Sequence, residues 1–195
     1  MANETLNLIY SFLGGGVVVA IFDWIRINKA ERVSRRLAEL SNQIQKLYGP
    51  LYFFVSQNER CFELNKSIMD AYRKEYVEVK YSDDPLTQER LNHKTSITLD
   101  LANAYVRLVT KNNERIIKIL SDNYSYIDPD DADVFQQFVI DCNRLEIERD
   151  ESAKLKTPHE IYDHVGEISF MRPNFLQCVK SKFTAKKKEI DTLNK

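Results

Sequence analysis

Glycine and proline are scarce in this chain, with five of each among 195 residues. A fold made of many short strands and tight turns needs more of both, because these two residues supply the backbone angles that turns require. Charged residues make up 29% of the chain, and apolar residues recur at helical intervals. The sequence therefore predicts an all-α fold.

Cysteine is also rare, and Cys61, Cys142 and Cys178 are far apart. An odd number of cysteines does not form a complete disulfide framework, and wide spacing is unlike that of a compact metal site. All three fall in apolar helical patterns, so we interpret them as reduced core residues of a cytosolic domain.

The chain has no glycine-rich phosphate loop and no recognisable nucleophile motif. His159 and His164 suggest a zinc-protease helix, but five residues place them about 140° apart instead of on one face. The acidic segment that starts at Asp128 resembles a calcium loop, yet Asp133 and Val139 occupy the positions of its essential glycine and glutamate. We attribute its acidic residues to helix capping and the helix dipole instead. We therefore predict no catalytic residue, no metal site and no cofactor, and we favour a role other than catalysis.

A strong excess of charge of one sign is absent as well, since the formal net charge is -1. Proteins that bind nucleic acid carry a basic field, which a balanced chain does not supply. No nucleic-acid partner is expected.

One long uncharged run stands out at the start of the chain, from Thr5 to Phe22. As a helix its 18 residues extend about 27 Å, close to the ~30 Å hydrocarbon core of a bilayer. Three consecutive glycines, Gly14, Gly15 and Gly16, weaken insertion without preventing it. The run is followed directly by five basic residues: Arg26, Lys29, Arg32, Arg35 and Arg36. Because basic residues stay on the cytoplasmic side, the run predicts a single span with the N-terminus outside and the rest of the chain cytoplasmic.

The predicted organisation has three parts: a membrane anchor over residues 1–25, a basic juxtamembrane helix over 26–48 and a cytoplasmic helical domain over 49–195. Gly49 and Pro50 are expected to end the juxtamembrane helix. Beyond them the apolar periodicity predicts an elongated antiparallel bundle, for a total of about five or six helices. Asp84 followed by Pro85 is the predicted cap and first residue of one of these helices. The helices of this bundle are expected over about residues 51–78, 85–121, 129–147 and 157–166, and from 173 onward.

The anchor and the domain also suggest binding partners. Ser11 with Gly15, and Gly16 with Ala20, are small residues four apart, a spacing that allows transmembrane helices to pair. Membrane lipid is one expected partner, and a second copy or another protein is the other. The candidate contact residues are the aromatic corner at the predicted helix break and a basic stretch of the last helix: Tyr48, Tyr52, Phe53, Lys186, Lys187 and Lys188. Core packing for the aromatics and a solvated face for the lysines are the alternatives.

Two further functions stay open. Asn58 and Asn65 fall on the apolar stripe of one helix, where a buried asparagine is usually a packing or register device that requires hydrogen-bond partners. The alternative is an enzyme or ligand-sensing domain with a pocket between helices near them or near His164. Alternatively, a soluble bundle could bury residues 5–22 in its own core or in a multimer.

Three short strings of the chain are distinctive: residues 47–54 (LYGPLYFF), 124–131 (YSYIDPDD) and 168–173 (ISFMRP). They resemble small uncharacterised bacterial proteins that have one N-terminal membrane span. The resemblance implies a bacterial inner-membrane protein with a helical cytoplasmic domain, and it implies no activity or site residue.

Overall fold

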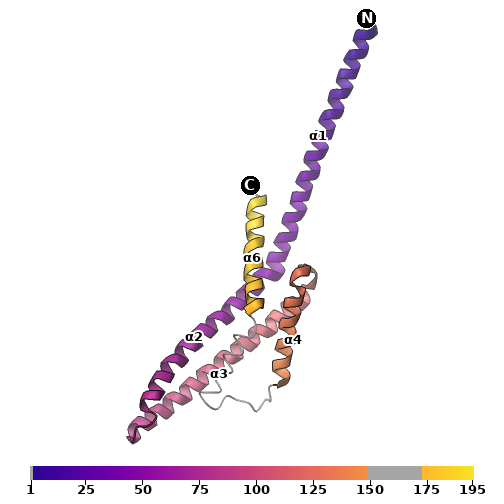
Figure 1. The fold of residues 1–195 in the computed structure, drawn as a ribbon. Helices are drawn as coiled ribbons and strands as arrows, with labels where there is room; N and C mark the ends of the chain where they lie inside the picture. The colour runs from indigo at the N-terminus through magenta and orange to yellow at the C-terminus, as the bar shows by residue number, and fades with distance from the viewer. Residues whose placement is uncertain (1, 149–172) are drawn as a thin grey trace.

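The computed structural model describes residues 2–148 and 173–195, and it describes side chains for residues 19–144 and 173–195. Within these ranges the chain is helical and contains no strand (Figure 1), which confirms the predicted all-α fold. The longer helices are α1 (Ala2–Gln43), α2 (Gly49–Val79), α3 (Pro85–Asp122), α4 (Ala132–Glu148) and α6 (Pro173–Leu193). A bundle of five or six helices is not supported: of the described helices, α2, α3, α4 and α6 pack together, and α1 projects away from them (Figure 1). The short helix expected over residues 157–166 lies outside the described residues.

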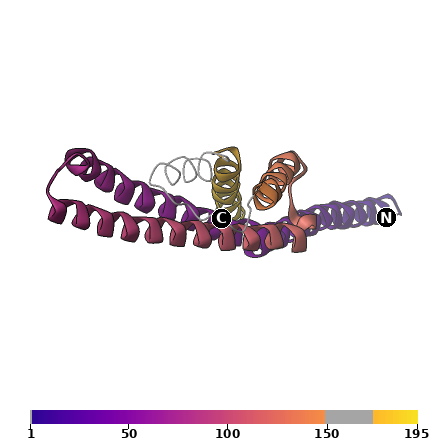
Figure 2. The same ribbon diagram turned by 90° about the horizontal axis from the view of Figure 1, so that it is seen from below.

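Helix α1 extends away from the other helices, with the N-terminus at its far end, in both views of the molecule (Figures 1 and 2). Six large apolar side chains on this part are 50–69% exposed: Val19, Ile21, Phe22, Trp24, Ile25 and Ile27. In the part of the chain that the structure describes, we found no helix long and apolar enough to cross a membrane. The span expected over residues 5–22 stays a prediction, since the side chains of residues 2–18 are not described.

The prediction that the helix ends at Gly49 and Pro50 is wrong, because the chain stays helical through these two residues. Residues Ile44–Tyr48 make a π-helical turn, η1, and the Gly49 amide donates to the carbonyl of Ile44. A π turn changes the register of the backbone hydrogen bonds, so it accommodates a proline that has no amide and whose ring crowds the preceding turn. The chain therefore changes direction here and continues into α2 without a loop (Figure 1).

This turn requires a glycine at position 49, because there is no room for a side chain. A Cβ atom added to it would lie 2.6 Å from the carbonyl oxygen of Ile44, which is a backbone atom that cannot rotate away. We expect Gly49→Ala to destabilise the protein by about 2 kcal/mol, within the range for an overpacked site, as measured by urea unfolding. Ser67→Ala, at an exposed position of α2, should stay within about 0.5 kcal/mol of the wild type. A Gly49→Ala variant of wild-type stability would contradict the steric argument.

Helices α2 and α3 run side by side as a long antiparallel hairpin, and α4 and α6 lie on the same side of it (Figure 2). The start of α3 is set as predicted, because the Asp84 carboxylate accepts from the amides of Leu86 and Thr87 at 3.4 and 3.1 Å. This cap fixes the turn at one end of the hairpin.

The main core lies at the other end, where η1, α2, α3, α4 and α6 meet. Its buried residues are Leu47, Tyr48, Leu51, Val55, Ile116, Leu120, Phe135, Phe138, Phe175 and Val179. Phe175 of α6 stacks on Phe138 with ring centroids 4.0 Å apart and meets the edge of Phe135 at 5.4 Å. A smaller cluster near the hairpin turn contains Met69, Tyr72, Leu91 and Ala102. The core therefore holds α6 against the bend between α1 and α2.

Candidate functional site

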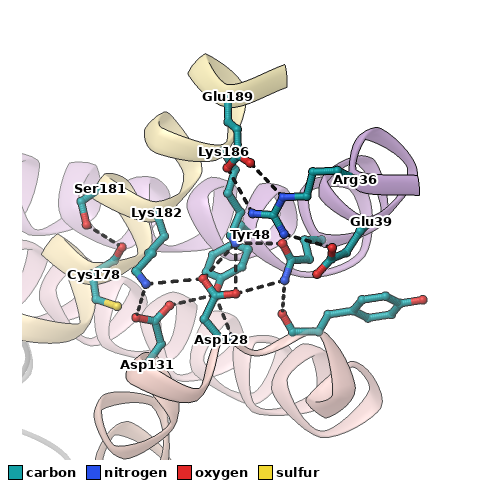
Figure 3. Close-up of polar contacts among 12 residues, drawn as sticks. Arg36, Glu39, Tyr48, Asp128, Asp131, Cys178, Ser181, Lys182, Lys186 and Glu189 are labelled. Atoms are coloured by element: carbon teal, nitrogen blue, oxygen red, sulfur yellow. Dashed lines mark hydrogen bonds and ion pairs between the residues drawn. The ribbon is translucent and has the colours of Figure 1, made fainter. Parts of the chain in front are cut away.

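Five polar side chains gather beside this bend, and we call them the junction cluster: Tyr48, Asp128, Asp131, Lys182 and Lys186. They come from η1, from the segment that leads into α4, and from α6 (Figure 3). Lys186 is 5% exposed and Asp131 is 3% exposed. Charged residues are this deeply buried only when they are paired, so the contacts within the cluster decide what it does.

Lys186 lies at the centre of the cluster. Its ammonium group donates to both carboxylate oxygens of Asp128, at 3.1 and 2.9 Å, and to Oε1 of Gln43 at 2.8 Å. The same group lies 4.9 Å from the centroid of the Tyr48 ring. These contacts use the hydrogen-bonding capacity of the ammonium group and compensate for its loss of water.

Tyr48 links the two aspartates. Its hydroxyl donates to Oδ2 of Asp131 at 2.8 Å and accepts from the Asp128 amide at 3.3 Å. Burial raises the pKa of Tyr48 far above its ordinary value, and the hydrogen bond to Asp131 adds to this. The phenol therefore stays neutral and holds the segment in place. Lys182 completes the cluster, with its Nζ 2.9 Å from Asp131 and 3.4 Å from Asp128.

The cluster makes stability depend on pH at both extremes. Burial alone would raise the pKa of Asp128, but the hydrogen bond and charge of Lys186, with the charge of Lys182, outweigh it and hold that pKa below 3.8. For Lys182, burial would lower the pKa, but the hydrogen bond and charge of Asp131 outweigh it and raise the pKa above 10.5. Asp128 contributes fully to the free energy of unfolding above the pKa that it has in the unfolded chain, and this contribution is lost as the pH falls through its pKa in the folded protein. Lys182 contributes fully below the pKa that it has in the unfolded chain, and its contribution is lost as the pH rises through its pKa in the folded protein.

We therefore expect the free energy of unfolding to vary little between about pH 5 and 9 and to fall on both sides. Chemical unfolding at a series of pH values measures this. Asp128→Asn should make the free energy of unfolding depend less on pH below about pH 5, because the amide does not titrate. If the free energy of unfolding of the variant falls as steeply in acid as that of the wild type, Asp128 is not responsible for the fall.

A second set of ion pairs ties α6 to α1. The guanidinium of Arg36 donates to both carboxylate oxygens of Glu189, at 2.8 and 3.2 Å, and to Glu39 at 3.0 Å (Figure 3). Both side chains of the Arg36–Glu189 pair are 42% exposed, so the pair positions the helices more than it stabilises them. Of the predicted basic residues, Arg26 and Arg35 instead pair along α1 with Asp23 and Glu31. Lys29 and Arg32 lie exposed on the same helix.

Fewer of the predicted contact residues are exposed than the sequence suggested. Tyr48 is fully buried and Lys186 nearly so, and neither can meet a partner or a lipid in this arrangement. Phe53 is 55% exposed, and Tyr52, which stacks on Phe183 at 4.6 Å, is partly exposed. Lys187 and Lys188 lie exposed on α6.

The other lysines of α6 are also held inward, because Lys180 pairs with Glu59 at 2.5 Å and Lys182 belongs to the junction cluster. The basic run of α6 is therefore divided between a buried face and an exposed one.

Groups that could hold a metal ion are absent from the described residues. The carboxylates of Asp128 and Asp131, which resembled a calcium loop, are instead bound by lysines. His159 and His164 lie outside the described residues. Cys61 and Cys178 are free thiols, and burial, followed by the charge of Asp131, raises the pKa of Cys178 to about 11. Such a thiol is protonated and unreactive near neutral pH.

A cavity of about 110 Å³ lies between α2, α3, α4 and α6, next to the main core. Apolar side chains form most of its wall: Val55, Cys61, Phe62, Val106, Val109, Ile116, Phe138, Phe175 and Leu176. The polar lining consists of Asn58, Glu59, Asn65, Tyr105 and Asn113. Both asparagines that the sequence placed near a pocket thus line the same cavity, while His164 lies outside the described residues.

The asparagines of this region differ in how their amides are used. Asn58 donates to Asn113 at 2.9 Å and accepts from Asn112 at 2.8 Å. Asn65 is 1% exposed, and within the described part of the chain neither its Nδ2 nor its Oδ1 has a hydrogen-bond partner. A buried polar group left unpaired costs about 1–3 kcal/mol. Among the described residues that line the cavity, Asn65 is therefore the one whose buried amide makes no hydrogen bond to another described residue.

The fold and the cluster define the class of protein: a helical hairpin and its C-terminal helix, joined by a buried ionic cluster to a long projecting helix. No protein-family model, curated protein or solved structure matches the chain. The resemblance to bacterial proteins with one membrane span therefore stays a prediction.

Proposed function

We propose that the protein is a single-pass membrane protein of the bacterial inner membrane, whose helical domain binds a partner protein or a second copy of itself at the cytoplasmic face. The main support is the isolation of α1, which extends from the bundle with large apolar side chains exposed (Figure 1). Soluble monomers rarely leave a long apolar surface uncovered. A lipid phase or a partner helix is the environment that such a helix fits.

The order of residues along α1 fits a bilayer. The uncharged residues 5–22 come first, and Trp24, which is 67% exposed, follows at the position where amphipathic rings meet the headgroups. Arg26, Lys29 and Arg32 come next, and each basic residue near an anionic leaflet contributes about 1 kcal/mol. This order supports a cytoplasmic location of the bundle, because basic residues next to a span stay on that side.

Helix α1 would also set the distance between bundle and membrane. Leu40 is the first fully buried residue of the described chain, and it comes 18 residues after Phe22. At 1.5 Å per residue this stretch of helix spans about 27 Å. The domain would thus be held clear of the headgroups, with the exposed Tyr52, Phe53, Lys187 and Lys188 available to a partner.

Membrane fractionation tests the proposal. The full chain, expressed in bacteria with a C-terminal fluorescent protein, should stay in the membrane pellet after high-salt and carbonate washes, and the fluorescence should face the cytoplasm. Light scattering of the detergent-extracted protein then reports self-association. Recovery in the soluble fraction as a multimer would contradict the anchor and favour a bundle that buries residues 5–22.

A further inference from the structure

One side of α3 carries a row of exposed apolar side chains, which we call the α3 stripe. The stripe consists of Ile97, Leu101, Ala104 and Leu108. Its three large side chains are 41–47% exposed. Val106 and Asn113, which line the cavity together with residues of α4 and α6, lie about 160° away around the helix. Because α4 and α6 lie on one side of the hairpin (Figure 2), the stripe faces away from both of them.

The spacing of the α3 stripe is that of a coiled-coil seam. Its residues follow one another in steps of four, three and four, which keeps them on one line along the helix. Leu64 of α2, which is 49% exposed, widens this apolar surface. It lies two turns after Gln57, which accepts a hydrogen bond from Asn112 of α3, one turn after Leu108. A connected apolar surface of this kind is typical of a contact with another protein.

The charged residues beside the stripe restrict which helix fits it. His93, Asp100, Arg107 and Glu114 recur every seven residues along the edge that lies away from α2, and all four are exposed. Among the described residues none of the four has an ion-pair partner. The charge alternates from Asp100 to Arg107 to Glu114, so a helix with the opposite order of charges would complement this edge.

A second copy of α3 supplies that order when it runs antiparallel. A two-fold axis that brings Leu101 next to Ala104 of the second copy also brings Asp100 next to Arg107 of the second copy, and it does so twice. In a parallel pair the same two charges would face residues 105 and 112 of the second copy, which are the uncharged Tyr105 and Asn112. Charge complementarity therefore favours the antiparallel pair.

Basic residues at the two ends limit this contact to the centre of the stripe. Lys94 and Lys111 would come together in a continuous antiparallel coiled coil, where like charges oppose contact. Helices that cross at about 50° diverge on both sides of their contact and keep these lysines apart. Lys94 is in addition paired with Glu75 of α2. A short crossing contact thus fits the charges better than an extended coiled coil.

We propose that the α3 stripe is the contact surface of a homodimer, in which two copies of α3 cross antiparallel and Asp100 of each copy pairs with Arg107 of the other. This inference rests on the part of the proposed function that gives the domain a second copy as its partner. It does not depend on the membrane anchor, because every residue that it uses lies in the hairpin of α2 and α3.

Charge exchange at the two paired positions tests the dimer. The full-length chain, extracted in detergent, is measured by light scattering over a range of concentrations, and we expect a dimer. Asp100→Arg and Arg107→Asp should each weaken it about tenfold or more, because two attractive contacts become repulsive. A mixture of the two variants should form a heterodimer of near wild-type affinity, because each arginine then meets an aspartate. Circular dichroism should stay unchanged, since both positions are exposed.

A pair of lysine substitutions tests the apolar part of the contact. Leu101→Lys should give a monomer, whereas Ile140→Lys, at a 52% exposed position of α4 outside the stripe, should keep the wild-type dimer. A dimer that survives Leu101→Lys would place the contact on another surface, such as α1, and would overturn the proposal. A monomeric wild type, or a mixture of the two charge variants that stays monomeric, would overturn it as well. The carbonate wash of the same proteins tests the anchor separately.

Discussion

Replacing Lys186 with methionine is expected to lower the free energy of unfolding by about 3 kcal/mol, at the lower end of the range for breaking a buried ion pair. Methionine fills a similar volume but provides no donor for Asp128 or for Gln43, both of which now bind the ammonium group. Asp128 retains Lys182 at 3.4 Å, which keeps the loss from being larger. Guanidinium unfolding followed by circular dichroism measures the change.

Lys187→Met is the matched control, because Lys187 is the next residue of the same helix and is exposed. Its substitution should change stability by no more than about 0.5 kcal/mol. The double variant Lys186→Met with Asp128→Asn should recover part of the loss, since it removes both charges together. Equal effects of Lys186→Met and Lys187→Met would mean that the buried pair does not hold α6.

Local signals in the sequence predicted local structure well. The scarcity of glycine and proline predicted the all-α fold, and the Asp84–Pro85 pair predicted the start of α3. Gly49 and Pro50 were misinterpreted, because the same dipeptide can end a helix or mark a π turn. The choice between them depends on packing around the bend, where a Cβ atom added to Gly49 would contact the ring of Phe183, far along the chain.

The junction cluster was missed because its partners are distant in sequence. Asp128 and Asp131 were attributed to capping and the helix dipole, yet the side chain of Asp128 makes no capping hydrogen bond and binds Lys186 instead. The sequence of α6 does contain a pattern that could have indicated the cluster. Phe175, Val179 and Lys186 share one buried stripe, with Lys182 half-buried beside it. A lysine on an apolar stripe indicates a buried acidic partner, although the stripe cannot say which one.

For Asn58 and Asn65, the cavity was predicted only as the alternative to a packing or register role. Asn58 and Asn65 were singled out because both interrupt an apolar stripe, and both line the cavity. Their different roles could not be predicted, since Asn112 and Asn113 of α3 bind the amide of Asn58, whereas the amide of Asn65 has no hydrogen-bond partner among the described residues. Such a distinction depends on the register between two helices, which periodicity alone does not fix.

Leu13→Arg is expected to release the protein from the membrane. Residue 13 lies at the middle of the uncharged run, where exchanging leucine for arginine costs about 3–4 kcal/mol of insertion free energy. The glycines at 14–16 leave the run favourable to insertion by only a few kcal/mol, so this cost removes most or all of it. We expect the fluorescent fusion to move from the carbonate-resistant pellet to the soluble or aggregated fraction.

Ala30→Arg provides the matched control, because it adds the same charge to the same helix at an exposed position beyond the run. An extra basic residue on the cytoplasmic flank should leave insertion unchanged or strengthen it. The contrast separates the two environments proposed for residues 5–22. A lipid core rejects arginine at residue 13 and accepts it at residue 30, whereas a soluble multimer loses its assembly on Leu13→Arg without any change in the membrane fraction.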